Sequence, residues 1–591
     1  MARIVSPIRV AMDRHRPISA STRSRLWVLA ASVAGWVAAV SVLFSIGNVA
    51  VASAPRPGAK PITTTITPST TTSVLRASAA SPSSTASPAA TTSAPSGSGG
   101  NLLTGREATF SGTTGGWVGL DSTLSWAKTP STTNNGSLQM TATASSWVYA
   151  WSPFPPSGPP TPAKPGQKFT GDAAVYLTGS PQPMSVGLVF LNSSNAQVGG
   201  FLGQSVTPGS STWTTLPEVA YVAPPSTTEV AVGVVAYSAS VGQVFYVESP
   251  TLTMLGPGSP VVVGPLHTSG NQVVQANGTP VVLQGVVLEG LEVTPYLNDP
   301  GVTQQAVVEA REWGANFVRV PLGEQFWLSS NCDYVSSYQS TVDQVVNWIT
   351  SLGMVALLDL HTNTVEGCEP GAQQNMADAA QSPTFWSQVA GRYGNSSSPE
   401  YNPLVAFDLY NEPHDISDSV WLDGGQTTDT FWPYQTFEAA GMQQLYNAVR
   451  GAGSQNLVFI SGNNWANDPP SQLVSGTNVV NAVHYYTCPI SAPPSCSNPD
   501  PYDPSQDFNR WLSLSQTQPI VVTEFGWPSD KDGTYIANVI AFAYAHQWGW
   551  SAYAWQQVSN WGGLTFETFL SDGTAEPEPS GVPVLLGLSA G

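Results

Sequence analysis

The stretch Pro519-Ile520-Val521-Val522-Thr523-Glu524 decides the fold, because an unbroken run of apolar and β-branched residues ends on a carboxylate. A strand that is buried on both faces has this composition, as in an all-parallel sheet. Residues 404–410 repeat the pattern and are followed by Asn411 and Glu412. A carboxylate at the carboxyl end of such a strand lies at the open rim of a barrel, where side chains from several strands converge.

Eight runs of this kind lie between residue 266 and the end of the chain, separated by amphipathic segments such as 304–313 and 341–349. They are residues 281–288, 316–322, 354–360, 404–410, 456–461, 479–485, 519–524 and 549–555. Eight strand–helix repeats in roughly 320 residues predict an α/β fold, a (β/α)8 barrel over 266–591. A doubly wound open sheet is the alternative. It requires a Gly-rich phosphate-binding turn after the first strand, and the sequence has none there.

Residues 101–256 have a different pattern, with short strand-like segments between Gly, Pro and Ser. Examples are residues 173–177, 184–190 and 229–237. Strands at this spacing without a helical pattern predict an all-β sandwich. Residues 257–265 are then a short linker to the barrel.

The N-terminal hundred residues predict export. Six arginines between Arg3 and Arg25 precede an uncharged apolar run over residues 26–47, and Ala50-Val51-Ala52 offers a cleavage site. Residues 1–54 are therefore interpreted as a signal peptide, or as a membrane tether through residues 26–47 if cleavage does not occur. Residues 55–100, rich in Ser, Thr, Ala and Pro, predict a disordered linker. We expect a secreted or surface-anchored protein.

Composition limits the partners of the 591-residue chain. Charged residues make up 10% of it, and the formal net charge is -19. Nucleic acid is not an expected partner, because neutralising phosphates needs clustered Lys and Arg. The six histidines form no His-x-x-x-His pair and there is no carboxylate cluster of suitable spacing, so neither a metal nor another cofactor is expected. We expect a monomer that acts on a neutral, hydroxyl-rich substrate.

Polar or aromatic residues stand at the ends of six of the predicted barrel strands. They are Arg319, His361, Asn411, Glu412, His484, Tyr486, Glu524 and Trp555. The ordered set resembles glycoside hydrolase family 5, the cellulase-rich family of clan A. The motifs that carry the resemblance are Asn316-Phe317-Val318-Arg319-Val320-Pro321, Asp359-Leu360-His361, Asn411-Glu412-Pro413-His414, His484-Tyr485-Tyr486 and Thr523-Glu524-Phe525-Gly526. Many cellulases of the family have Gly where Thr523 stands.

The resemblance implies that Glu412 is the acid/base and Glu524 the nucleophile. Cleaving an acetal needs both groups at once, and carboxyls about 5 Å apart give retention through a covalent glycosyl-enzyme. We expect Arg319 to keep Glu524 ionised, and a less polar setting together with the nearby negative charge of Glu524 to raise the pKa of Glu412. Supporting roles follow for the remaining residues. Asn411 contacts the sugar's 2-hydroxyl, His484 and Tyr486 orient the two glutamates, Trp555 floors a subsite, and His361 serves a neighbouring subsite.

Residues 101–256 resemble the jelly-roll carbohydrate-binding modules of secreted glycosidases, through features such as Asn101-Leu102-Leu103, Gly116-Trp117 and Thr212-Trp213. Aromatic side chains stack on sugar faces, so Trp117, Trp147, Tyr149 and Trp151 are candidates for stacking. The last three share strand parity and are predicted to face one side of a sheet. Whether that side is the core or a binding face stays open at this point.

Four cysteines, Cys332, Cys368, Cys488 and Cys496, predict two disulfides in an exported chain, and three pairings are possible. The function predicted is that of a retaining β-glycanase, an endo-β-1,4-glucanase acting on cellulose or a related β-glucan. A β-mannanase or β-1,3-glucan hydrolase of the same fold is the enzymatic alternative. A non-catalytic polysaccharide-binding protein is the alternative of another class.

Overall fold

The computed structural model describes residues 100–590 except 146, 155–157, 225, 298–301, 365–370, 431–434, 487–502, 527–532, 556–566, 570–574 and 578–580. The predicted signal peptide or anchor and almost all of the predicted linker lie outside these residues, as do Cys368, Cys488 and Cys496. Within the described ranges, none of the helices has the length and apolarity that a membrane span requires.

The C-terminal half forms a closed barrel of parallel strands, in the order β16-β17-β18-β19-β22-β23-β24-β25. The strands are β16 (Gln284–Val287), β17 (Phe317–Gly323), β18 (Val355–Thr362), β19 (Val405–Asp408), β22 (Val458–Ser461), β23 (Val479–Tyr486), β24 (Ile520–Gly526) and β25 (Gly549–Ala552). Each predicted run contains one of them or overlaps it. The predicted barrel is confirmed.

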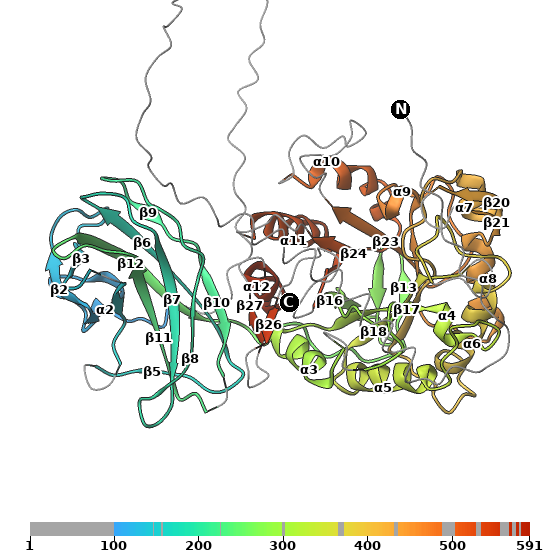
Figure 1. Cartoon of the computed structure of the whole chain (residues 1–591), viewed down its shortest axis with the longest axis horizontal. Coiled ribbons are helices and arrows are strands. Elements are labelled where there is room, and N and C mark those ends of the chain that lie inside the picture. Colours follow the sequence, from blue (N-terminus) through green and yellow to red (C-terminus); the bar gives the residue numbers. More distant parts are fainter. Residues whose placement is uncertain are drawn as a thin grey trace, which may run out of the picture. The chain divides into compact units, whose positions relative to one another are not determined.

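Helices cover the outside of the barrel, and Figure 1 shows α3 and α5 running beside its first strands. The helices are α3 (Gln304–Trp313), α4 (Glu324–Trp327), α5 (Tyr338–Ser351), α6 (Ser382–Tyr393), α7 (Asp418–Asp423), α8 (Met442–Gly451), α9 (Asn463–Ala466), α10 (Ser505–Phe508), α11 (Thr534–His546) and α12 (Val582–Ala590). Helix α3 begins where the Thr303 side chain accepts a hydrogen bond from the Ala306 N–H and ends at Gly314, which has a positive φ of 115°. Its buried residues, among them Val307 and Trp313, face the barrel.

Short β elements complete this half. A small sheet of β13 (His267–Ser269), β14 (Gln272–Val274) and β15 (Pro280–Val281) precedes the barrel. Two hairpins follow later in the chain, β20 (Gly425–Asp429) with β21 (Gln435–Ala439) and β26 (Glu567–Phe569) with β27 (Ala575–Pro577). Cys332 is disulfide-bonded, as the even cysteine count predicted, and its possible partners all lie outside the described residues.

Residues 118–254 form two antiparallel sheets of six strands each. The first sheet has the order β1-β4-β11-β7-β8 with β5 paired to β11, and the second has the order β10-β6-β12-β3-β2 with β9 paired to β6. The strands are β1 (Val118–Leu120), β2 (Ser122–Ala127), β3 (Ser137–Ala142), β4 (Val148–Trp151), β5 (Thr161–Pro162), β6 (Lys168–Leu177), β7 (Met184–Leu191), β8 (Gln197–Leu202), β9 (Thr214–Thr215), β10 (Val219–Val222), β11 (Glu229–Ala236) and β12 (Val244–Met254). One short helix, α2 (Arg106–Thr109), precedes them.

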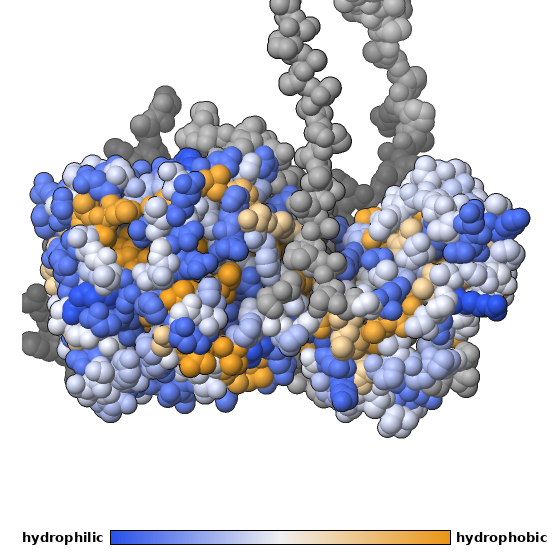
Figure 2. Space-filling view, turned by 180° about the vertical axis from the view of Figure 1, so that it is seen from behind, coloured by the Kyte–Doolittle hydropathy of each residue, from blue (hydrophilic) through white to orange (hydrophobic). Residues whose placement is uncertain are grey.

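The core of these two sheets is a cluster of buried apolar side chains that includes Leu138, Val148, Phe169 and Val232. Figure 2 shows that hydrophobic side chains also reach the surface, as patches set between hydrophilic ones. The specific jelly-roll assignment and the domain boundaries stay predictions.

Candidate active site

The two predicted catalytic glutamates converge at the carboxyl ends of their strands. Glu412 follows β19, and Glu524 lies within β24. One carboxylate oxygen of each and a ring nitrogen of His484 lie within 4.8 Å of one another. The expected approach of the two carboxyls is therefore confirmed, and it matches the separation of about 5 Å in glycosidases that retain anomeric configuration.

Glu524 is held on both of its oxygens. Arg319 donates to Oε1, and the Tyr486 hydroxyl donates to Oε2 at 2.7 Å. The side chain is only 4% exposed, and His484 Nδ1 lies 3.6 Å from Oε2. Donors on both oxygens fix the direction of the carboxylate, which suits a nucleophile.

Arg319 is the centre of a buried charge network that the sequence revealed only in part. Its guanidinium is fully buried and lies 3.0 Å from Asp359 and 3.0 Å from Asp408, in addition to Glu524. It also donates to Asn411 Oδ1 at 2.8 Å, which orients that amide toward the site. Burial alone would lower the pKa of Arg319, but the three carboxylates raise it overall, so the group stays charged.

For Asp408, burial has a larger effect on the pKa than the neighbouring charge of Arg319. Burial raises the pKa of this carboxyl to about 7, although the charge of Arg319 acts to lower it. One guanidinium thus faces more carboxylates than it can neutralise.

Glu412 accepts hydrogen bonds from two side chains. His484 Nδ1 lies 2.8 Å from Oε1, and Gln373 donates to Oε2 at 2.6 Å. Burial raises the pKa of Glu412, but these hydrogen bonds and the charges of His484 and His361 outweigh it, and the pKa is lowered. The expectation of a raised pKa was wrong for the free protein, because the setting of Glu412 is more polar than the sequence suggested.

His361 lies beside the network. Its Nδ1 is 2.7 Å from Asp359 Oδ2, and its Nε2 is 3.5 Å from the Asn411 amide nitrogen. Burial would lower the pKa of His361, but the hydrogen bond and charge of Asp359, together with Glu524 and Glu292, raise it to about 9. The imidazolium therefore helps to balance the buried carboxylates.

Trp555 does not floor a subsite, so this prediction was wrong. Its side chain is 0% exposed, donates to the Ala306 carbonyl of α3 at 3.0 Å and packs edge-on against Trp313 at 4.7 Å between ring centroids. Tyr553 is the aromatic residue beside the site, with its ring 6.4 Å from that of Tyr486. Burial, followed by the charge of Glu524, raises the pKa of the Tyr553 phenol.

The cluster of Glu412, His484 and Glu524 also has the atom spacing of a cation site. Its ligand atoms are already engaged, however, because His484 Nδ1 bonds to Glu412 and the Glu524 oxygens accept from Arg319 and Tyr486. The donor set suits proton transfer better than a metal, which needs deprotonated, unshared ligands.

The aromatic candidates of the two-sheet region divide into two groups. Trp117 is 5% exposed within the core and donates to the Glu107 carbonyl, so its assignment to sugar stacking was wrong. Trp147, Tyr149 and Trp151 point away from the core, because Val148 and Ala150 between them are the buried residues of β4. Their predicted common face is confirmed.

Paired carboxylates at the carboxyl rim of a closed barrel are the geometry of a retaining glycoside hydrolase. Residues 274–559 match the family model described as Cellulase (glycosyl hydrolase family 5). This segment is therefore similar to glycosyl hydrolase family 5.

Curated proteins are similar to parts of the chain. Endoglucanase EG-II of Hypocrea jecorina is 29% identical over 157 residues, which are 26% of this chain and 32% of that protein. A mannan endo-1,4-beta-mannosidase of Cellvibrio japonicus is 23% identical over 50% of this chain and 59% of its own length. The chain thus spans about a third to three fifths of these relatives.

Solved structures are similar to parts of the chain as well. The catalytic domain of Thermobifida fusca endoglucanase Cel5A, in complex with cellotetraose, has a TM-score of 0.40 and 16% identity, covering 55% of this chain and 97% of that chain.

Proposed function

We propose that this protein is a retaining β-glycanase, an endo-β-1,4-glucanase exported from the cell. The observation that carries the proposal is the pair Glu412 and Glu524, whose carboxylate oxygens lie within 4.8 Å of one another and of His484. Relatives named as endoglucanases support the same reading.

Glu524 attacks the anomeric carbon in the first step of the proposed reaction. Arg319 and Tyr486 hold its two oxygens, so the carboxylate is aimed without further ordering. Glu412 protonates the leaving oxygen at the same time, and the glycosidic C–O bond breaks as the ester bond to Glu524 forms. The aglycone leaves as an alcohol.

Glu412 acts as a base in the second step. It removes a proton from water, the resulting oxygen attacks the anomeric carbon, and the bond to Glu524 breaks. His484 Nδ1 lies 2.8 Å from Glu412 Oε1 and stays in contact with that carboxyl as its charge changes. Asn411 is held by Arg319 and serves the 2-hydroxyl, a contact that strengthens as positive charge develops on the sugar.

The substrate proposed is a β-1,4-glucan. A mannan is the alternative that a specific observation favours, since one matched relative is named a mannan endo-1,4-beta-mannosidase. A panel of carboxymethyl-cellulose, barley β-glucan, glucomannan, xylan and laminarin separates these substrates, and an early fall in viscosity identifies endo cleavage. Preference for glucomannan would identify a β-mannanase. Preference for laminarin would identify a β-1,3-glucan hydrolase.

The catalytic assignment is tested with Glu524→Gln, which keeps the shape of the side chain and removes the nucleophile. We expect activity to fall by at least about a thousandfold, as for other single losses of a nucleophile. Glu312→Gln, an exposed carboxylate on α3, is the matched control and should leave activity unchanged. Equal hydrolysis by wild type and Glu524→Gln would refute the mechanism. Absence of activity on every β-glycan would favour a non-catalytic binding protein.

We further propose that residues 101–256 bind the glycan on the outer face of the β4-containing sheet. A groove of about 570 Å³ is lined there by Tyr149, Trp151 and Phe154 with polar neighbours such as Asn195 and Gln197. The rings of Tyr149 and Trp151 are stacked, with centroids 6.1 Å apart and planes 16° from parallel.

Glycines beneath Trp151 support this use of the groove. A Cβ at Gly233 would lie 2.2 Å from the indole, and one at Gly187 would lie 3.1 Å from it. Because neither residue has a Cβ, the indole lies flat on the sheet, as a sugar platform requires. We expect Trp151→Ala to reduce retention of the protein on insoluble cellulose about tenfold, whereas Trp126→Ala, exposed outside the groove, should not. Equal retention of both variants would make the region a spacer.

Export is proposed from the arginine-rich, apolar N-terminus. Fractionation of an expressing culture tests it, with activity expected in the medium or on the cell surface. Activity confined to the cell interior would contradict it.

A further inference from the structure

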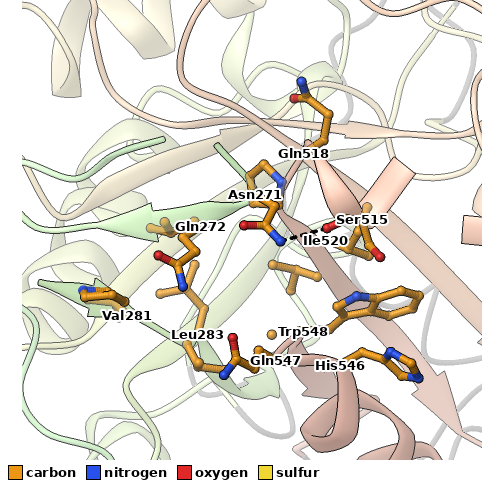
Figure 3. Close-up of a pocket in the computed structure, with 16 residues that line it drawn as sticks. Asn271, Gln272, Val281, Leu283, Ser515, Gln518, Ile520, His546, Gln547 and Trp548 are labelled. Atoms are coloured by element: carbon orange, nitrogen blue, oxygen red, sulfur yellow. Dashed lines mark hydrogen bonds between the residues drawn. The ribbon is translucent and has the colours of Figure 1, made fainter. Parts of the chain in front are cut away.

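A pocket opens at the end of the barrel opposite the two glutamates. It is lined by the β14–β15 hairpin, the start of β24 and the turn between α11 and β25, and Figure 3 shows its residues. Strand β24 begins in the pocket at Ile520 and carries Glu524 four residues later. At about 3.3 Å per residue the two sites are about 13 Å apart along this strand, so the pocket is separate from the cleft.

An unsatisfied donor lies in the wall of this pocket. Trp548 is 3% exposed, and its indole Nε1–H has no hydrogen-bond partner among the described residues. In Figure 3 the nitrogen-bearing edge of the ring faces the other lining residues. Several other buried indoles are paired, such as Trp386 with the Leu409 carbonyl at 2.9 Å and Trp555 with Ala306, whereas that of Trp550 is not. A buried donor without an acceptor is uncommon and favours a ligand that supplies one.

The polar groups of the pocket are neutral. Three primary amides, those of Asn271, Gln272 and Gln547, lie around an apolar floor that includes Leu283 and Ile520, whereas the Gln518 amide extends away from it (Figure 3). The Asn271 amide nitrogen donates to the Ser515 carbonyl at 2.9 Å, which fixes that side chain and leaves its oxygen toward a ligand.

None of the sixteen lining residues is a carboxylate, lysine or arginine. The one titratable side chain is His546, whose pKa is lowered by burial, so it is neutral at pH 7. An ionic ligand would lose its hydration in this pocket without gaining a charged partner. The pocket therefore suits a neutral molecule with hydroxyl groups around its edge and an apolar face.

The volume of the pocket is about 220 Å³. This exceeds the ~30 Å³ that one water molecule occupies and is below the ~300 Å³ at which pockets for drug-sized ligands begin. One sugar ring fits these limits, whereas an extended chain does not.

We propose that this pocket is a second, non-catalytic glycan site that binds one terminal glucosyl residue, with the Trp548 indole donating to a sugar oxygen. The choice of glucose rests on the proposed function. The site would hold a chain end away from the cleft and so keep the enzyme on its polymer between cleavage events.

The test measures the NMR signal of the Trp548 indole N–H during a titration with sugar. Full-length Glu524→Gln protein, labelled with ¹⁵N on tryptophan, is titrated with cellobiose, and Trp548→Phe identifies the signal. Trp550→Phe is the matched control, because that indole N–H is also buried and unpartnered but lies outside the pocket. We expect saturable movement of the Trp548 signal at millimolar sugar and none of the Trp550 signal.

Two variants at other lining residues of the pocket provide a test that leaves Trp548 and its packing unchanged. Gln272→Ala and Asn271→Ala each remove an amide from the pocket, and each should weaken the titration about three- to tenfold. Inhibition of wild-type hydrolysis by cellobiose, which reports the cleft, should be unchanged by either variant. Failure of the proposed function thus appears in hydrolysis, and failure of this inference appears in the Trp548 titration.

Three results would overturn the inference. The Trp548 signal stays in place up to about 10 mM cellobiose, or it moves without saturating, or both amide variants titrate as the parent does. Tighter binding of glucuronate than of glucose would show that the assigned ligand class is wrong.

Discussion

The hydrogen bond from Gln373 to Glu412 sets the pH range of the proposed acid catalyst. Gln373 Nε2 lies 2.6 Å from Glu412 Oε2, and this hydrogen bond helps to lower the pKa of that carboxyl. Gln373→Ala removes a donor that stabilises the carboxylate form, so the pKa of Glu412 should rise. The alkaline limb of kcat/KM, which reports loss of the acid's proton in the free enzyme, should then move to higher pH.

The magnitude follows from the strength of such a bond. A hydrogen bond to a charged group contributes about 1.5–3 kcal/mol, and water that reaches the carboxylate after truncation restores part of it. The Glu412 side chain is 13% exposed, which permits this replacement. A remaining loss of about 1 kcal/mol corresponds to a shift of about 0.7 pH units, because one unit is 1.36 kcal/mol.

The assay is the pH profile of kcat/KM on barley β-glucan, extended to the acid side of the ordinary carboxyl range because the pKa of Glu412 is lowered. Gln444→Ala, exposed on α8, is the matched control and should reproduce the wild-type profile. An aryl glycoside with a good leaving group needs little protonation, so its profile should respond less to Gln373→Ala. An alkaline limb that stays in place, or moves to lower pH, would refute the assigned role of this hydrogen bond.

Three further predictions concern the buried network and its surroundings. Arg319→Met should destabilise the barrel by about 3–5 kcal/mol, seen as a lower denaturant midpoint, because it leaves buried carboxylates without their cation. Trp555→Ala should cost a similar ~3–5 kcal/mol by opening a core cavity, whereas Tyr553→Phe should keep stability within about 1 kcal/mol and change kcat/KM instead. His361, with a pKa raised to about 9, should contribute about 3 kcal/mol that is present below pH 6.5 and lost as pH rises through 9. His361→Asn should flatten that part of the stability profile.

The barrel could be predicted because each of its strands is buried on both faces. Such strands read as apolar runs whatever their loops contain, and the polar residues that end the runs lie at one rim. Arg319, Glu524 and Tyr486 follow this rule, and they make the predicted contacts.

Strand periodicity could not predict the side-chain directions of residues that follow the end of a strand. β25 ends at Ala552, so Tyr553 and Trp555 lie where alternation no longer fixes the direction of a side chain. The barrel core has space beside Trp313 for one indole, and Trp555 occupies it. Trp117 shows the same limit, because an aromatic residue between turns serves a core or a surface equally well.

Loop residues gave no signal at all. Gln373 lies in the long connection after β18 and carries no motif, yet it determines part of the proton affinity of Glu412. Asp408 was hidden for another reason, since an acidic residue inside an apolar run reads as an interruption. It becomes meaningful only once Arg319 is seen beside it.

The buried charges explain why stability and the proposed chemistry oppose one another here. Arg319 faces Asp359, Asp408 and Glu524, and the pKa of Asp408 raised to about 7 shows that burying these charges has a cost. A well-packed apolar set would be as stable or more so. Asp359 and Asp408 nevertheless fix the guanidinium through its Nη2 and Nε atoms, and Nη1 is left to bind Glu524. A nucleophile that is fixed in a buried position requires such a cation, so the charges that are costly to bury are the ones on which the proposed reaction depends.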